Sequence, residues 1–284
     1  MNDLFPRTTV AGVSLPRLLI GTNWMLGWSH TSAAADAHIK DSVTQQSICG
    51  ILKVFLDNGV DAVMACCHNQ TMFLDAIKQT EQSQGRKLII IDTPIIDVGD
   101  SAQSRQNARA LIRESKKNGA TFCFPHHSST EQLVNKNTGQ IPRLSDYLEM
   151  IREEGLIPGL SAHMPELILF SDANDYDVET YIQLYNPLGF LMQIEIETVA
   201  KIIHNAKKPV MTIKPFAAGR TTPFVGLNFV YNTIRECDMV TIGCLTPREA
   251  AEDIEIARAA IGRYMPNLEG RTSPAKTELI RGKV

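Results

Sequence analysis

Short runs rich in apolar and β-branched residues alternate along the chain with longer segments of helical character. There are eight such runs, at residues 17–23, 61–66, 87–92, 120–124, 156–162, 181–185, 209–214 and 239–244. Because these runs are apolar almost throughout, they are typical of parallel strands that helices cover on both faces. Eight β–α units without an intervening linker predict an α/β fold, the (β/α)8 TIM barrel, in which parallel strands close into a cylinder.

The remaining segments fit around this barrel as a single domain of residues 1–284. Residues 4–16 carry "AGVS" at an expected turn and predict a short N-terminal hairpin. The barrel itself is expected over residues 17–262, and a polar C-terminal tail follows at residues 263–284. A doubly wound open sheet is the alternative, but no G-x-G-x-x-G pattern follows the first strand.

The segment after the eighth run has the clearest helix start in the sequence. Thr246 is expected as the N-cap, Pro247 takes the first helical position, and Glu249 stands three residues after the cap. This spacing is that of a capping box, in which two side chains accept hydrogen bonds from each other's backbone N–H groups. A helix is therefore predicted where the barrel requires one.

The net charge and the spacing of the cysteines limit which partners and which cellular compartment are expected. The formal net charge is −3, with no concentrated run of Lys or Arg, so neither nucleic acid nor a membrane surface is an expected partner. No signal peptide and no stretch of the ~20 apolar residues that cross a bilayer is visible. The six cysteines form no C-x-x-C pair, which favours reduced thiols. We expect a cytoplasmic protein with a small-molecule ligand, and the sequence leaves its oligomeric state open.

Active sites of such barrels form where the strands end at their carboxyl termini. The side chains there that can carry chemistry are His68, Asp92, His126 and Lys214, and we predict these four as catalytic. Lys214 closes an apolar strand, so it needs solvent or a partner, and burial would lower its pKa and make it a base or nucleophile. Asp92 precedes "TP", and a turn that accepts backbone hydrogen bonds is an equal alternative for it.

The same strand ends offer a second set of ligands. His68, Asp92, His126 and His163 are imidazoles and a carboxylate, which suit a divalent metal such as Zn²⁺. Neither an H-x-H nor an H-E-x-x-H spacing supports this site, so it is the alternative to the metal-free one.

Seven stretches in order resemble the aldo/keto reductase superfamily. They are "TTVAGVSLPRLLIGTNW", "GVDAVMACCHN", "ATFCFPHH", "IREEGLIPGLSAH", "IQLYNPL", "KPFAAG" and "IGCLTPREAAEDI", and together they cover residues 8–262. The resemblance implies the same barrel and, in the typical member, carbonyl reduction by NADPH with a tetrad of Asp, Tyr, Lys and His.

Only the histidine of that tetrad is retained, at His126 or His127. The aspartate position holds Met64, the tyrosine position falls at Asn69, and the lysine position holds Asp92. A carboxylate in place of the lysine cannot lower a tyrosine pKa as a cation would. The resemblance therefore implies a divergent member without the usual proton donor.

Cofactor recognition follows the resemblance only in part. Ser161 and Gln183 match positions that would hold the nicotinamide amide, and Arg220 with the helix start at Thr246 could hold an anion. Glu249 stands where a basic residue usually meets the 2′-phosphate, and its charge repels a phosphate. Both NAD(P)H and a divalent metal are left open as cofactors.

A classical NADPH-dependent reductase would need a nonstandard proton donor such as His68 or Tyr185, and three other functions compete with it. The first is a divergent enzyme that uses acid/base chemistry on a small carbonyl or sugar-like compound, with standard NADPH reduction doubtful. The second is a metal-assisted hydrolase or lyase. The third is a non-catalytic barrel that binds a ligand or a partner, which the replacement of three tetrad positions would explain.

Overall fold

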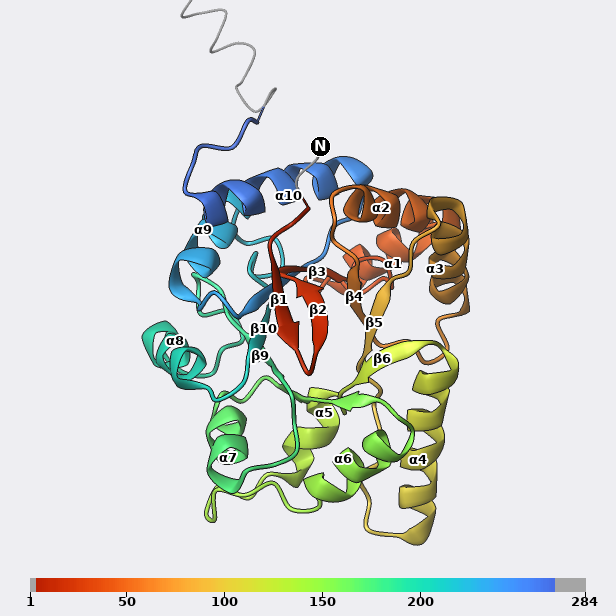
Figure 1. The fold of residues 1–284 in the computed structure, drawn as a ribbon, viewed down its shortest axis with the longest axis vertical. Helices are drawn as coiled ribbons and strands as arrows, with labels where there is room; N and C mark the ends of the chain where they lie inside the picture. Colours follow the sequence, from red (N-terminus) through yellow and green to blue (C-terminus); the bar gives the residue numbers. More distant parts are fainter. Residues whose placement is uncertain (1–3, 269–284) are drawn as a thin grey trace, which may run out of the picture.

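The computed structural model describes residues 4–268, and its chain begins with a two-stranded antiparallel hairpin. Strand β1 (Arg7–Val10) pairs with β2 (Val13–Pro16) through a turn in which Ala11 and Gly12 both have positive φ. Val10 and Leu15 of this hairpin are buried against residues of the barrel interior. The hairpin lies across the amino-terminal end of the barrel, at the centre of the view in Figure 1.

A sheet of parallel strands forms the barrel. In chain order its strands are β3 (Leu18–Gly21), β4 (Ala62–Ala65), β5 (Ile89–Asp92), β6 (Ala120–Cys123), β7 (Ile157–Pro158), β8 (Leu160–Ala162), β9 (Tyr181–Leu184), β10 (Val210–Ile213) and β11 (Met239–Ile242). Their order in the sheet is β7-β6-β5-β4-β3-β11-β10-β9-β8. The first barrel strand of the chain, β3, therefore pairs with the last, β11. The predicted (β/α)8 barrel with an N-terminal hairpin is thereby confirmed.

The fifth predicted run is split into β7 and β8 at Gly159. Pro158 cannot donate to a ladder, and a Cβ on residue 159 would stand only 2.5 Å from Cδ1 of the Phe124 ring. β7 pairs with β6, whereas β8 pairs with β9. The two short strands therefore join the two edges of the sheet and close the cylinder.

Helices surround the strands on the outside. They are α1 (Ala33–Ser42), α2 (Gln45–Asp57), α3 (Thr71–Gln84), α4 (Ala102–Lys117), α5 (His127–Thr130), the 3-10 turn η1 (Glu131–Leu133), α6 (Leu144–Glu153), α7 (Glu166–Asn174), α8 (Ile196–Asn205), α9 (Pro223–Thr233) and α10 (Pro247–Gly262). The capping box of Thr246 and Glu249 at the start of α10 is present as predicted. Within residues 4–268, no helix has both the length and the apolar character to cross a membrane.

Alternation along the strands separates an inner from an outer apolar core. The inner cluster combines the hairpin with residues from seven of the barrel strands, including Leu19, Ile91, Ile182 and Met211. The neighbours of these residues in sequence point outward and pack under the helices. Whether a strand-end residue reaches the barrel mouth or the helix layer therefore depends on its position within this two-residue period.

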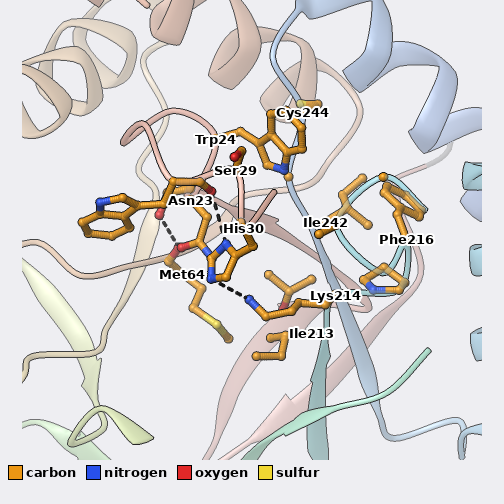
Figure 2. A pocket seen from close by; sticks show the side chains of 18 of the residues that line it. Asn23, Trp24, Ser29, His30, Met64, Ile213, Lys214, Phe216, Ile242 and Cys244 are labelled. Carbon is orange, nitrogen blue, oxygen red and sulfur yellow. Dashed lines mark hydrogen bonds between the residues drawn. The ribbon is translucent and has the colours of Figure 1, made fainter. Parts of the chain in front are cut away.

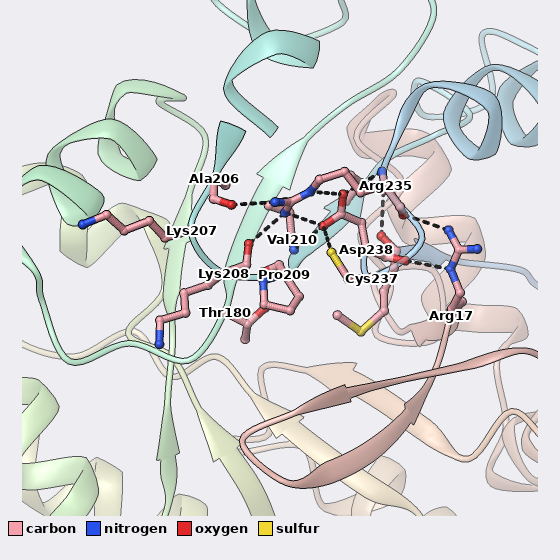
Figure 3. Close-up of polar contacts among 12 residues, drawn as sticks. Arg17, Thr180, Ala206, Lys207, Lys208, Pro209, Val210, Arg235, Cys237 and Asp238 are labelled. Atoms are coloured by element: carbon pink, nitrogen blue, oxygen red, sulfur yellow. Dashed lines mark hydrogen bonds and ion pairs between the residues drawn. The ribbon is translucent and has the colours of Figure 1, made fainter. Parts of the chain in front are cut away.

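A buried ion pair fixes the amino-terminal end of the barrel. Asp238 is fully buried, and its carboxylate accepts hydrogen bonds from the backbone of Val210 at the start of β10 and from Arg235. Arg235 also donates to the carbonyls of Ala206 and Lys208 (Figure 3). One carboxylate thus joins the end of α8, the start of β10 and the turn before β11.

The expected tail begins along α10. The backbone N–H of Asn267 donates to Glu255, and Leu268 packs against the outer core. Residues 269–284 of the predicted tail lie outside the described residues.

We predict that Asp238→Ala lowers the free energy of unfolding by about 3–5 kcal/mol, because it leaves the Arg235 guanidinium without its buried partner. Urea unfolding followed by circular dichroism measures the change. Asp57→Ala removes a half-exposed partner of Lys53 and serves as the matched control, with an expected loss below about 1 kcal/mol. Equal losses in the two variants would contradict the assigned role of the buried pair.

Candidate functional site

A cavity of about 970 Å³ opens at the carboxyl ends of the barrel strands. Its wall is largely apolar and includes Trp24, Ile213, Phe216 and Ile242, which Figure 2 shows around a small number of polar groups. In a cavity of this kind, a few convergent polar side chains mark the candidate site. Lys214 is one of these polar groups.

The backbone of Lys214 adopts a left-handed conformation, with φ 59°. Ile213 lines the cavity, so a regular strand would turn the next side chain outward toward the helices. The positive φ turns Lys214 back over the strand ends instead. Its Nζ lies 3.1 Å from Nε2 of His30, and burial lowers the pKa of the Lys214 ammonium to about 8.

His30 comes from the loop between β3 and α1. Its Nδ1 is 3.3 Å from the carbonyl oxygen of Trp28, which can only accept a hydrogen bond, so Nδ1 carries the proton. Nε2 is then the acceptor for the Lys214 ammonium. Burial and the nearby Lys214 charge lower the pKa of His30. The two groups therefore share a hydrogen bond in which the proton rests on Lys214, because its pKa is the higher of the two.

His126 is held as a neutral imidazole with a defined tautomer. Its Nδ1 accepts from the backbone N–H of Ser128 at the start of α5, which places the proton of the neutral ring on Nε2. Burial, His127 and Lys214 lower the pKa of His126 to about 4, while Glu131 opposes them. At neutral pH His126 can donate a hydrogen bond from Nε2 without carrying a formal charge.

Two further histidines stack beside His126. The rings of His127 and His163 are 3.5 Å apart between centroids, with an interplanar angle of 18°. Burial, with His127 and Lys214 close by, lowers the pKa of His163 to about 3. Glu131 holds this corner, because its carboxylate accepts the backbone N–H groups of His163 and Met164.

Asp92, predicted as catalytic, does not line this cavity. Ile91 faces the barrel interior, so the next side chain points into the layer under α4. There Asp92 accepts the backbone N–H of Cys67, and burial raises its pKa. The turn-like alternative, a carboxylate that binds backbone groups, describes its surroundings better.

His68 is also placed away from the cavity. It is exposed on the outside of the barrel, where its Nδ1 lies 2.8 Å from a carboxylate oxygen of Glu114 in α4. The predicted metal ligands His68 and Asp92 therefore do not meet His126 and His163. Within residues 4–268, no group of three His, Cys, Asp or Glu side chains could hold a metal ion.

The residues predicted to hold a nicotinamide are divided. Ser161 lines the cavity, but Gln183 follows the inward-facing Ile182 and does not. The Gln183 Nε2 donates to the carbonyls of His163 and Leu184, and its Oε1 has no hydrogen-bond partner among the described residues. Of the two residues expected to hold the nicotinamide amide, Ser161 lines the cavity and Gln183 does not.

The start of α10 does not offer the expected anion site. Thr246 does not line the cavity, and its hydroxyl accepts the backbone N–H of Glu249. The Glu249 carboxylate accepts the N–H groups of Leu245 and Thr246, so these donors are already used. Glu249, Glu252 and Asp253 all line this part of the cavity, and burial raises the pKa of Asp253 to about 8.

Arg220 does reach the cavity, as predicted. Its guanidinium lies 4.1 Å from the Phe190 ring centroid and donates to the carbonyl of Ala217. With three carboxylic acids beside one arginine, the residues at this end do not fit the 2′-phosphate of NADPH.

The thiols near the strand ends are unsuited to nucleophilic roles. Cys66 lines the cavity, but burial and Asp92 raise its pKa to about 11. Cys67 and Cys123 are buried outside the barrel interior, and burial raises the pKa of both. A thiol that stays protonated is a small apolar side chain, as expected from the sequence.

We predict that the buried histidines make stability fall with acidity. The folded-state pKa of His163 lies below the ordinary value, so between about pH 6.5 and 3 the unfolded chain binds a proton that the folded chain does not. The free energy of unfolding therefore decreases as pH falls through this window, by a few kcal/mol.

Urea unfolding at pH 7 and pH 5 should show a smaller acid-induced loss for His163→Gln than for the wild type. His38→Gln, on the exposed face of α1, is the control and should follow the wild type. A His163→Gln variant with the full wild-type loss would contradict the neutral, buried state of this ring.

Comparisons with known proteins show which solved structures have a similar fold. The sequence matches no model of a protein family, and no curated protein matches it significantly. Among solved structures, a putative aldo-keto reductase from Pseudomonas aeruginosa is similar at 16% identity and a TM-score of 0.64, over 92% of this chain and 96% of that one.

Two other solved structures show how far the similarity extends. A glycerol dehydrogenase from Gluconobacter oxydans has 12% identity and a TM-score of 0.60, over 94% of this chain and 98% of that one. An orotidine 5′-monophosphate decarboxylase from Methanocaldococcus jannaschii has 13% identity and a TM-score of 0.51, over 86% and 99% of the two chains. The chain therefore has the barrel fold of the aldo-keto reductases, at a level of identity that shows the fold alone.

Proposed function

We propose that this chain is a cytoplasmic enzyme that acts on a small carbonyl or sugar-like compound by acid/base chemistry at the barrel mouth. The observation that carries the proposal is the hydrogen bond between the partly buried Lys214 and the solvent-exposed His30, both of which line a largely apolar cavity. His126 lines the same cavity with an Nε2–H available for donation. These are a basic pair and a neutral hydrogen-bond donor, which are the groups that proton transfer next to a carbonyl needs.

The roles follow from the protonation states. The Lys214–His30 pair would take a proton from the carbon next to the carbonyl group, since either nitrogen can hold it. The negative charge then develops on the carbonyl oxygen, where the Nε2–H of His126 would stabilise it. A neutral imidazole suits this task. Because the pKa of His126 is low, its Nδ1 stays unprotonated at neutral pH and keeps the hydrogen bond that it accepts from the Ser128 backbone.

The predicted catalytic roles of His68 and Asp92 are not part of this proposal, because both side chains lie outside the cavity. NADPH-dependent reduction is not part of it either, since the residues do not fit the cofactor's 2′-phosphate. A ligand-binding barrel without catalysis is the outcome that the experiments below distinguish from an enzyme.

We predict that the protein catalyses exchange of the hydrogens next to the carbonyl group in at least one small hydroxyaldehyde or hydroxyketone. Proton NMR in D2O measures the loss of these signals. Lys214→Met and His126→Gln should each lower the exchange rate by roughly 10²–10⁴-fold, the usual contribution of a general acid or base. Lys78→Met removes an exposed lysine and is the matched control. Exchange that survives in both site variants would overturn the proposal, and binding without exchange would favour a non-catalytic barrel.

We further predict that the exchange rate rises with pH, with a midpoint near pH 8. The basic form of the pair requires a neutral Lys214 amine, and its pKa is about 8. Below that pH the amine is protonated and the rate falls. A profile recorded from pH 6 to pH 10 tests this expectation, and a rate that is constant through pH 8 would contradict the role of Lys214.

A third prediction concerns the cofactor. Both tryptophans of the chain, Trp24 and Trp28, line the cavity, so a bound dinucleotide would quench their fluorescence. We expect no saturable quenching by NADPH, because Glu249, Glu252 and Asp253 line the region where its 2′-phosphate would lie. NADH differs by this phosphate alone and is the matched control. Saturable quenching by NADPH that equals or exceeds that by NADH would restore the reductase interpretation.

A further inference from the structure

We propose that Lys214 acts as a covalent catalyst, whose Nζ forms a Schiff base with the carbonyl carbon of the substrate while His30 receives the proton. This inference rests on the proposed carbonyl substrate and assigns the two members of the basic pair to different tasks. It adds a nucleophile and a bound intermediate to what the acid/base proposal requires.

The first support is the isolation of Lys214 from carboxylates. Six other lysines in the described chain form salt bridges with Asp or Glu, namely Lys53, Lys78, Lys87, Lys136, Lys207 and Lys208, whereas burial without any opposing carboxylate lowers the pKa of Lys214. The side-chain partner of Lys214 is the neutral acceptor His30, at 3.1 Å. A carboxylate partner would hold the ammonium form, whereas a histidine can accept its proton and release the amine lone pair.

The second support is the placement of the amine. Lys214 is turned into the cavity by a left-handed backbone, a conformation that costs a residue with a side chain about 1 kcal/mol or more. The backbone N–H of Ala217 donates to the carbonyl of Lys214, so the turn that follows holds this conformation. Figure 2 shows the amine reaching past Ile213 toward the His30 ring.

The third support is a donor for the departing oxygen. His126 lines the same cavity, and Lys214 is close enough that its charge contributes to the lowered pKa of both His126 and His163. The Nε2–H of His126 can bind the carbonyl oxygen as negative charge develops there. The nucleophile and the group that stabilises its product thus face one cavity.

The chemical step balances without a cofactor. The Lys214 amine, having given a proton to Nε2 of His30, attacks the carbonyl carbon, so a C–N bond forms and the C–O π electrons move to oxygen. Proton transfer from nitrogen to oxygen gives a neutral carbinolamine. Its C–O bond then breaks as protonated His30 returns the proton that it received, so the oxygen leaves as water, His30 is neutral again, and a protonated imine remains. No atom is oxidised or reduced, and the positive imine draws electrons from the neighbouring carbon, which makes its hydrogen more acidic.

Borohydride trapping tests the covalent intermediate directly. The full-length protein is incubated with dihydroxyacetone, treated with sodium borohydride, digested and analysed by mass spectrometry. We expect the reduced adduct, a stable secondary amine, on the peptide that contains Lys214, in excess over any surface lysine. Borohydride treatment with dihydroxyacetone should also inactivate the exchange reaction, while borohydride alone should not.

Two variants separate the nucleophile from its proton acceptor. Lys214→Arg keeps a positive charge but cannot form an imine, so the adduct at this position should disappear. His30→Gln keeps the lysine and should slow adduct formation by roughly 10²-fold. Lys78→Arg is the control, and its trapping at Lys214 should equal that of the wild type. Thermal unfolding of each variant shows whether it is folded, and His30→Gln tests the inference even if Lys214→Arg is unstable.

The outcomes distinguish this inference from the function on which it rests. Trapping at Lys214 that depends on His30 supports both. Proton exchange that requires Lys214 but yields no adduct there would overturn the covalent role and leave the acid/base enzyme standing. Neither exchange nor trapping would overturn both.

Discussion

Closure of the parallel sheet at Pro158 and Gly159 is the constraint on which the rest of the architecture depends. The two residues interrupt one strand so that its halves pair with opposite edges of the sheet. The Phe124 ring occupies the space that a side chain on residue 159 would need. Because the cylinder is closed, all strand carboxyl ends meet in one ring, so that His127, which follows β6, stacks on His163, which follows β8 at the other edge of the sheet.

The chemistry of the mouth follows from what surrounds its basic groups. Histidines and one lysine gather there in a largely apolar wall, so burial and mutual repulsion disfavour their charged forms together. Such a site holds protons loosely and can exchange them with a ligand. A cluster of the same residues paired with carboxylates would instead remain charged and act mainly by attraction.

The strands and helices could be predicted from the sequence because eight apolar runs separated by helical segments allow few other folds. The residues that line the site could be predicted only in part. Successive side chains of a strand point to opposite faces, so an error of one position exchanges the barrel mouth for the helix layer. Asp92 follows the regular alternation and faces the helices, whereas Lys214 escapes it through a positive φ that the sequence does not signal. No strand pattern in the sequence predicts the place of His30, because it depends on the path of the loop between β3 and α1. The resemblance to aldo/keto reductases predicted the fold, but neither it nor the helix-start pattern indicates the local hydrogen bonds that Gln183 and Thr246 make in the structure.

The N-terminal hairpin closes the amino-terminal end of the barrel. Val10 and Leu15 fill the amino-terminal end, and among residues 4–268 the cavity that Trp24 and Trp28 line opens at the opposite end of the barrel. In the proposed function, the product would leave through the same opening by which the substrate enters. For the proposed enzyme, product release would therefore precede binding of the next substrate, and motion of the loops at the cavity opening would affect the rate.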